Sequence, residues 1–378
     1  MRRLLLILPA VLGWLAITWF AGIRSGLLLL LGLGFGAALS GARFGFTTGW
    51  RNLITQRDPW GMVGQMVLVA LCALLAFPLL HNFQDEIVGA VAPITWSLVI
   101  GALVFGFSMQ LADGCGSGTM YKAGASSPTS WAALPGFITG SFLGASHLSA
   151  WTHLGGPLEF IDGASSKQPT DLIERFGVQS ALLITLGLCV AVAVISIAVS
   201  AREHRTKAQQ LPSIAPRWLW GAIAIAVLYA LHLIVAGQPW GVVYGLGLWG
   251  AKAFSALGLD LSADAFWGIA PHADRLIEPV LWDVTSVTNI GLLYGALIAD
   301  RWHQPKSVAT PWPSASQLVI GVLAGLAMGY SSRLAFGCNV GAYLGGIASA
   351  SLHGWVWLAF AFIGSIFGVR ARIRAKIV

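Results

Sequence analysis

Long apolar runs alternate with short polar or glycine-rich segments along nearly the whole chain. A membrane-spanning helix needs about 20 mostly apolar residues, so the shorter runs must borrow flanking residues or enter the bilayer only part-way. The ten runs comprise residues 4–21, 26–40, 62–80, 96–111, 131–148, 178–200, 218–236, 287–299, 317–335 and 350–369. The pattern predicts an all-α polytopic membrane protein with about nine to ten transmembrane helices and short re-entrant glycine-rich segments.

Composition points the same way. Hydrophobic residues make up 56% and charged residues 10% of the 378, with a mean hydropathy of +0.75, which excludes a water-soluble domain of this length. The net charge of +7 comes without a long basic run, a helix-turn-helix pattern or an RNA-binding motif. We therefore expect the lipid bilayer as a partner, no nucleic acid, and an attraction for anions.

The distribution of basic residues predicts the topology. Sixteen of the 22 lysines and arginines fall on one side of the ten-run map, and the positive-inside rule then places both termini in the cytoplasm. The loops at 149–177 and 237–286, which hold most of the acidic residues, fall outside. The first run could be a secretory signal, but no clear cleavage site follows it, which favours a retained helix.

A polar linker, 201–217, divides the chain into two halves, 22–200 and 218–369, flanked by an extra helix at 1–21 and a basic cytoplasmic tail at 370–378. In each half a glycine-rich stretch (32–52 and 237–252) is followed by two helices and then by a cysteine-bearing turn. Three crossings separate the first cysteine turn from the second glycine-rich stretch, so the halves are expected to be inverted. Inverted halves with glycine-broken segments are typical of transporters whose site lies near the bilayer midplane.

The two cysteine turns carry the candidate chemistry. They read ADGCGSGTMYKAG (112–124) and FGCNVGAYLGG (336–346). Glycines let several backbone N–H groups point at one spot, and a following helix N-terminus favours an anion there. Small residues spaced four apart, at 136, 140 and 144 and at 321, 325 and 329, are expected to let the helices that hold these turns pack closely.

A thiol in such a turn could donate an S–H hydrogen bond to a passing anion or ionise and attack sulfur. The alternative is that these glycines only pack helices, but packing does not call for Asp, Lys and Asn beside a thiol. Cys72 and Cys189 lie within apolar runs and are expected to be small apolar fillers. With no C-x-x-C and scattered histidines, the sequence predicts neither a metal site nor a cofactor.

The cysteine turns, the stretch RLAFGCNVGAYLGGIASASLHGW (333–355) and ARFGFTTGWRN (42–52) together resemble the YeeE/YedE family of sulfur-compound transporters. The resemblance implies thiosulfate uptake, with a branch linked to selenium or other sulfur compounds, through inverted halves that meet at a constriction lined by cysteines. The family's central cysteine matches Cys115, and that of its second half matches Cys338. The family's first motif usually carries a cysteine where this chain has Gly45, so one relay thiol is missing.

The resemblance implies an importer of a small sulfur oxyanion in a bacterial inner membrane, with a TusA-like cytoplasmic sulfurtransferase as partner and no catalytic residue. The expected path residues are Cys115, Cys338, Gly114, Gly116, Ser117, Gly118, Gly337, Asn339, Gly45, Arg43, Arg51, Lys122 and Arg333. Two alternatives stay open: a membrane sulfurtransferase that forms a persulfide on Cys115, and a structural subunit that anchors a soluble sulfur enzyme. No general base is apparent beside Cys115, which argues against the enzyme.

Overall fold

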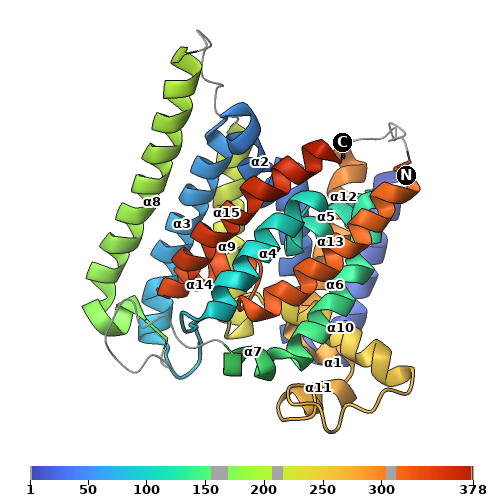
Figure 1. The fold of residues 1–378 in the computed structure, drawn as a ribbon. Helices are drawn as coiled ribbons and strands as arrows, with labels where there is room; N and C mark the ends of the chain where they lie inside the picture. Colours follow the sequence, from blue (N-terminus) through green and yellow to red (C-terminus); the bar gives the residue numbers. More distant parts are fainter. Residues whose placement is uncertain (1, 155–168, 207–215, 304–311, 376, 378) are drawn as a thin grey trace.

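A computed structural model describes residues 2–154, 169–206, 216–303, 312–375 and 377, and this part of the chain is helical without a named β-strand. The helices are α1 (Arg2–Ala42), α2 (Phe46–Gln56), α3 (Trp60–Asn82), α4 (Trp96–Leu111), α5 (Gly116–Gly124), α6 (Pro128–Ser146), α7 (Leu148–Leu154), α8 (Leu172–Thr206), α9 (Pro216–Ala236), α10 (Val242–Ala256), α11 (His272–Ile277), η1 (Val280–Trp282), α12 (Val284–His303), α13 (Ala315–Leu334), the π-helical η2 (Asn339–Leu344), α14 (Gly345–Ala348) and α15 (Leu352–Arg374). Figure 1 shows the long helices side by side, with the short helices α5 and α14 among them.

Seven stretches of the described chain are helical, long and apolar enough to cross a membrane. The expected runs at 131–148 and 287–299 form α6 and α12 but are not among the seven. Serine, threonine and glycine dilute the apolar residues of α6, and polar and charged residues do so in α12. The structure thus supports a multi-pass membrane protein and gives fewer clear spans than the ten runs suggested.

The first two apolar runs form a helical hairpin within α1. Gly22 has non-helical backbone angles, φ 85° and ψ 169°, that only glycine adopts readily. A Cβ on Gly26 would sit within 3.2 Å of side-chain atoms of both Thr18 and Trp14, whereas eight residues of straight helix span about 12 Å. The chain therefore folds back at Gly22, and the two expected segments are separated by a one-residue turn.

Glycines bring pairs of helices into backbone contact, as the four-residue spacing predicted. Gly136 and Gly140 of α6 lie against the carbonyl groups of Val322 and Leu326 in α13. In return, Gly325 and Gly329 lie against the carbonyls of two residues of α6, Ala133 and Phe137. The same device joins α4 to α15, where Gly106 meets Ala361 and Gly364 meets Leu103. The helices that lead into and out of the two cysteine turns are thereby packed against each other.

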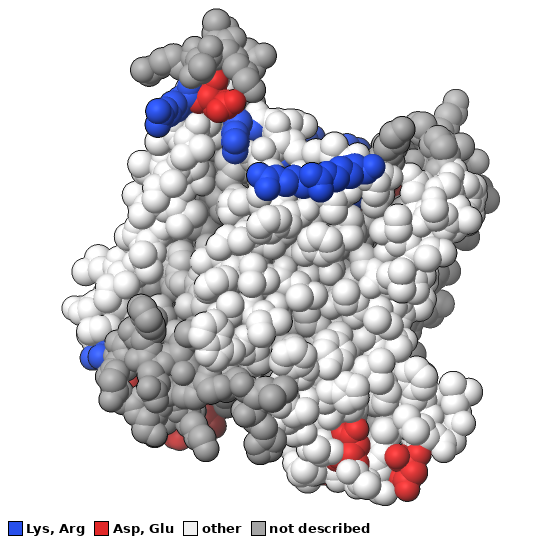
Figure 2. All heavy atoms as spheres, viewed as in Figure 1, with Lys and Arg blue, Asp and Glu red and all other residues white. Residues whose placement is uncertain are grey.

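The ends of the molecule differ in charge. Helix α1 begins and helix α15 ends at the same end of the molecule (Figure 1). This end is called the termini end below. On the face drawn in Figure 2, lysines and arginines gather at this end and most acidic side chains lie at the opposite end. Helix α15 continues to Arg374, so the expected tail at 370–378 is largely helical, and most of the expected linker, 207–215, lies outside the described residues.

Candidate functional site

The turn between α4 and α5 places a thiol at a helix N-terminus. Asp113 is in the left-handed region (φ 58°), Gly114 follows, and Cys115 is the N-cap of α5. The Cys115 Sγ accepts a hydrogen bond from the N–H of Gly118 at 3.3 Å and lies 3.6 Å from the Ser117 Oγ. A Cβ on Gly114 would sit 2.8 Å from the backbone nitrogen of Thr119, so this position needs glycine. The thiol is buried, with 1% of its residue surface exposed.

The turn between α13 and η2 repeats this geometry. Phe336 has φ 59°, Gly337 has φ 147°, and Cys338 is the N-cap of η2, with φ and ψ of −98° and −167° against −83° and −169° at Cys115. In both cases Leu-Ala precedes the left-handed residue.

The segment from the cysteine to the next left-handed residue is one residue longer after Cys338 than after Cys115. The next left-handed residue, Ser126, follows Cys115 by eleven positions, whereas Ala350 follows Cys338 by twelve. A π-helix absorbs one extra residue, which explains why η2 is a π-helix while α5 is an α-helix.

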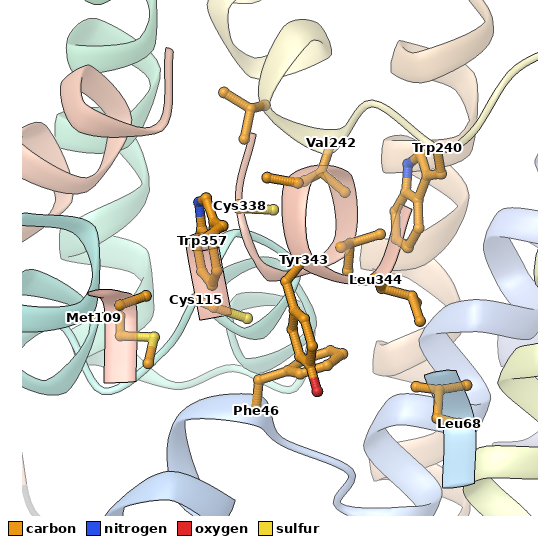
Figure 3. Close-up of a cluster of buried hydrophobic side chains, with 14 of the residues drawn as sticks. Phe46, Leu68, Met109, Cys115, Trp240, Val242, Cys338, Tyr343, Leu344 and Trp357 are labelled. Carbon is orange, nitrogen blue, oxygen red and sulfur yellow. The ribbon is translucent and has the colours of Figure 1, made fainter. Parts of the chain in front are cut away.

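The two turns meet at their cysteines. The backbone N–H of Ser117 lies against the Cys338 thiol, as do the N–H groups of Val340 and Gly341. A Cβ on Gly116 would sit 2.9 Å from the Cys338 Sγ. Figure 3 shows the two thiols between Val242, at the start of α10, and Phe46, at the start of α2. Both sulfur atoms therefore lie at the N-terminal end of α5, where the helix dipole and the N–H groups that point at the thiols favour negative charge.

Polar side chains around this point lack partners. Both amide atoms of Asn339 and the Oγ1 of Thr119 are buried without a hydrogen-bond partner in the described chain, and both residues are fully buried. A buried polar group without a partner costs stability unless something else binds it. These groups therefore have free hydrogen-bonding capacity next to the thiols.

A narrow pocket lies next to Cys115, on the side of α2. The pocket is too tight for a water molecule. The residues that line it come from the turn and first residues of α2 and from the first cysteine turn with α5: Phe44, Gly45, Phe46, Thr47, Thr48, Asp113, Gly114, Cys115, Ser117, Gly118, Tyr121 and Lys122. Gly45 is the N-cap of α2 and provides no side-chain cap. Within the described part of the chain, the Thr47 Oγ1 is buried without a hydrogen-bond partner. In place of a third thiol, this chain presents hydroxyl groups and the N-terminus of α2 at this pocket.

A carboxylate and three cations lie beside this pocket. Asp113 forms ion pairs with Arg51 and Lys122, both at 2.7 Å, and with Arg372 at 3.5 Å. Gln110 supports the cluster, because it accepts a hydrogen bond from the Arg51 Nε and its backbone carbonyl accepts one from Arg372. The cluster ties together α2, α4, α5 and α15.

Two pockets, of about 380 and 280 Å³, lie toward the end opposite the termini, one on each side of Phe336. Arg333 lines the smaller pocket together with His353. Its guanidinium lies 4.7 Å from the ring centre of Phe266, and its Nε is buried without a hydrogen-bond partner in the described ranges of the chain. His272 lines the larger pocket, and burial, with the positive charges of Arg333 and Arg275, lowers the pKa of this imidazole and so favours its neutral form.

Two buried amides, unforeseen from the sequence, hold the glycine-rich stretches in place. Gln65 in α3 accepts a hydrogen bond from the Trp50 indole at 2.8 Å and donates to the carbonyl of Phe46. Asn289 in α12 likewise accepts from the Trp240 indole at 3.0 Å and donates to the carbonyl of Val242. A polar residue within an apolar helix is a signal that could have identified both.

The structure brings most of the expected path residues together. Those at the meeting of the turns are Cys115, Cys338, Gly114, Gly116, Ser117, Gly118, Gly337 and Asn339, with Gly45 across the narrow pocket. Arg51 and Lys122 join through Asp113, which with Arg372 was missing from the expected set. Arg43 is exposed at the turn after α1, and Arg333 lies at a separate pocket toward the opposite end. Cys72 and Cys189 are buried in the hydrophobic core, and all four cysteines are free thiols.

This fold and site define a multi-pass helical membrane protein built around a buried pair of thiols. The chain belongs to the sulphur transport family, whose pattern matches residues 41–367. The resemblance that the motifs indicated is therefore confirmed.

Relatives of this chain carry the names of transporters. The chain is 23% identical over 344 residues to the thiosulfate transporter TsuA of Spirochaeta thermophila, covering 89% of this chain and 96% of that protein. It is 24% identical over 359 residues to the thiosulfate transporter TsuA of Escherichia coli, covering 91% and 93%. A shorter match, 29% identical over 148 residues, joins it to a protein of Escherichia coli named "Probable transporter YedE" and covers 39% of this chain and 36% of that one.

Proposed function

We propose that this protein imports a small sulfur oxyanion, thiosulfate, across a bacterial inner membrane. The observation that carries the proposal is the meeting of two N-cap cysteines at the N-terminus of α5, inside an apolar core. An anion there can accept hydrogen bonds from thiols and backbone N–H groups without a fixed counter-charge. The names of the two long-matching relatives support thiosulfate as the cargo.

The proposed path runs between two inverted halves. The supporting observations are the repeated turn geometry, the reciprocal packing of α4 on α15 and of α6 on α13, and the equivalent anchors Gln65 and Asn289. In this arrangement α5 and the η2–α14 segment are re-entrant, and about nine or ten helices cross the bilayer, with α6 and α12 shielded by their neighbours. The basic termini end faces the cytoplasm.

Along this path Arg333 attracts the anion from outside, and Cys338 and then Cys115 donate S–H hydrogen bonds to it. Gly116, Ser117, Gly118 and the amide of Asn339 supply further contacts around the thiols. The ion then leaves past Gly45 and the cations Lys122, Arg51 and Arg43. Gly114 and Gly337 provide the backbone angles that let the two turns meet.

Import of a dianion into a negatively charged interior requires a driving force. Moving a dianion inward against a negative interior costs about 4.6 kcal/mol per 100 mV. A cytoplasmic TusA-like sulfurtransferase that consumes the imported ion is the proposed sink, with proton co-transport as the competing source. A pH-jump experiment separates them, since only co-transport makes the initial uptake rate follow an imposed proton gradient.

The test of transport is uptake of thiosulfate, labelled separately at its two sulfur atoms, into proteoliposomes. With wild-type protein both labels should enter together, and Cys115→Ala should abolish uptake. Cys72→Ala and Cys189→Ala are matched controls and should transport normally, because both thiols only fill the core. Loss of uptake in both controls would overturn the assignment of the path.

The same measurement separates transport from a persulfide-forming sulfurtransferase. That enzyme would retain only the outer sulfur, bound to Cys115, and would release sulfite. Retention of one label on the protein therefore contradicts the transport proposal.

A further inference from the structure

The carboxylate of Asp113 lies where an anion leaving Cys115 would arrive. It is two residues from Cys115, and Asp113, Cys115 and Lys122 line the same narrow pocket. Its Oδ1 pairs with Arg51 at 2.7 Å and with Arg372 at 3.5 Å, and its Oδ2 pairs with Lys122 at 2.7 Å. Lys122 also donates to the backbone carbonyl of Asp113.

The cations have more binding capacity than Asp113 uses. Arg51 pairs through Nη1 with Asp113 and through Nε with Gln110, while its Nη2 is buried and has no hydrogen-bond partner among the residues that the structure describes. A guanidinium presents its donors as a planar fork that suits an oxyanion with more than one oxygen. The side chains of Arg51, Lys122 and Asp113 retain 20%, 21% and 28% exposure, so an ion in the adjoining solvent can contact them.

We propose that Arg51 and Lys122 form an inner binding site for a tetrahedral sulfur oxyanion. In this proposal Asp113 is a tethered competitor, and its carboxylate occupies the site when no anion is bound. The proposal rests on the proposed function, because the ion that arrives is the transported one. An arriving dianion displaces the carboxylate from the cations, and the returning carboxylate displaces the ion toward the cytoplasm.

This exchange predicts a weak inner site. While the carboxylate competes for the same N–H groups, the binding free energy of an anion is only the difference between its own contacts and those that it replaces. Without the carboxylate charge, the two cations bind an oxyanion more strongly and release it more slowly. Removal of Asp113 is therefore expected to strengthen anion binding and to slow transport.

The experiment measures binding of radiolabelled sulfate to the purified full-length protein in nanodiscs by equilibrium dialysis. Asp113→Asn keeps the shape and removes the charge, and it should bind sulfate about tenfold more tightly than the wild type. Arg51→Gln in the Asp113→Asn background should reverse the gain. Asp300→Asn, near the end of α12 and outside the pocket, is the matched control and should leave the affinity unchanged.

A second variant tests the proposal independently in case Asp113→Asn does not fold. Lys122→Gln keeps the Arg51–Asp113 pair and should weaken sulfate binding, whereas a purely structural cluster would leave binding unaltered. Unchanged sulfate affinity in a folded Asp113→Asn protein, or a gain that survives Arg51→Gln, overturns the proposal.

Uptake is measured in parallel with thiosulfate. If the wild-type protein takes up thiosulfate but Asp113→Asn does not change the sulfate affinity, the inner site is rejected and the transport proposal is retained. Tighter sulfate binding in Asp113→Asn without wild-type uptake would retain the anion site and reject transport.

Discussion

At the scale of single residues, Gly116 is the point on which the meeting of the two turns depends. Its missing side chain leaves room for the Cys338 thiol, and a Cβ would approach Sγ to 2.9 Å and the cysteine Cβ to 3.2 Å. Real Cβ atoms seldom come this close, so one of the turns would have to move. The hydrogen-bonding geometry around both thiols would change with it.

We therefore expect Gly116→Ala to reduce thiosulfate uptake by about tenfold or more, in keeping with the sensitivity of binding sites to small displacements. Gly341→Ala, in the other turn, is the matched control because a Cβ there meets nothing within 4 Å. Initial uptake rates in proteoliposomes, at equal amounts of folded protein, provide the comparison. Equal rates for the two variants would show that the contact between the turns is unimportant.

The sequence was informative about which residues carry the site and less so about their partners. Glycine and cysteine on the same short turn, with polar neighbours at the end of an apolar run, were sufficient to single out Cys115 and Cys338. The pairing of Asp113 with Arg51 and Arg372 could not be predicted, because these residues come from three distant segments that only tertiary packing brings together.

At the scale of elements, the helices around the site are held by backbone contacts between glycines and facing carbonyl groups. Gly140 of α6 would place a Cβ 2.0 Å from the carbonyl oxygen of Leu326 in α13. In a membrane, close packing of this kind replaces the hydrophobic effect as the force between helices. A larger residue must separate α6 from α13 and so disturb the turns that follow them.

Gly140→Val is expected to destabilise the fold by about 1–3 kcal/mol, the usual cost of overpacking. The measurement is the midpoint of thermal unfolding in detergent. Gly187→Val in α8 should change the midpoint little, since a Cβ there meets nothing within 4 Å. A similar loss in both variants would mean that valine within the helix, rather than the interface, is the cause.

Apolar periodicity located the elements well where a helix is uniformly hydrophobic. The run at 96–111 coincides with α4, and the run at 218–236 falls within α9. It also located α6 and α12 to within a few residues at each end, although their polar and small residues leave them outside the seven clear membrane spans. The π-helix of η2 could not be foreseen, because it depends on one extra residue relative to a turn elsewhere in the chain.

At the scale of the whole molecule, the separation of charge between the two ends predicts the orientation in the membrane. Ser262, in the segment before α11, and Ala375, after α15, are both exposed, and all four native cysteines are buried. Single reporter cysteines can therefore be introduced without removing the native thiols. Figure 1 shows the segment before α11 and the end of α15 at opposite ends of the molecule.

In intact cells, Ser262→Cys should react with a membrane-impermeant maleimide, and Ala375→Cys should react only after the membrane is permeabilised. The expectation follows from the excess of lysine and arginine at the termini end. Mass-tagging on a gel measures both, with the wild-type protein as the unreactive control. The reverse labelling pattern would place the basic end outside and contradict the proposed orientation.

The sharing of one helix end by two sulfur atoms has a kinetic consequence. Cys115 and Cys338 both lie at the N-terminus of α5, so two dianions could not occupy their positions together without strong mutual repulsion. If the proposed transport function holds, each protein molecule therefore carries one ion per cycle. Uptake should follow a single saturating curve in external concentration, and any second oxyanion that enters should inhibit the first by pure competition.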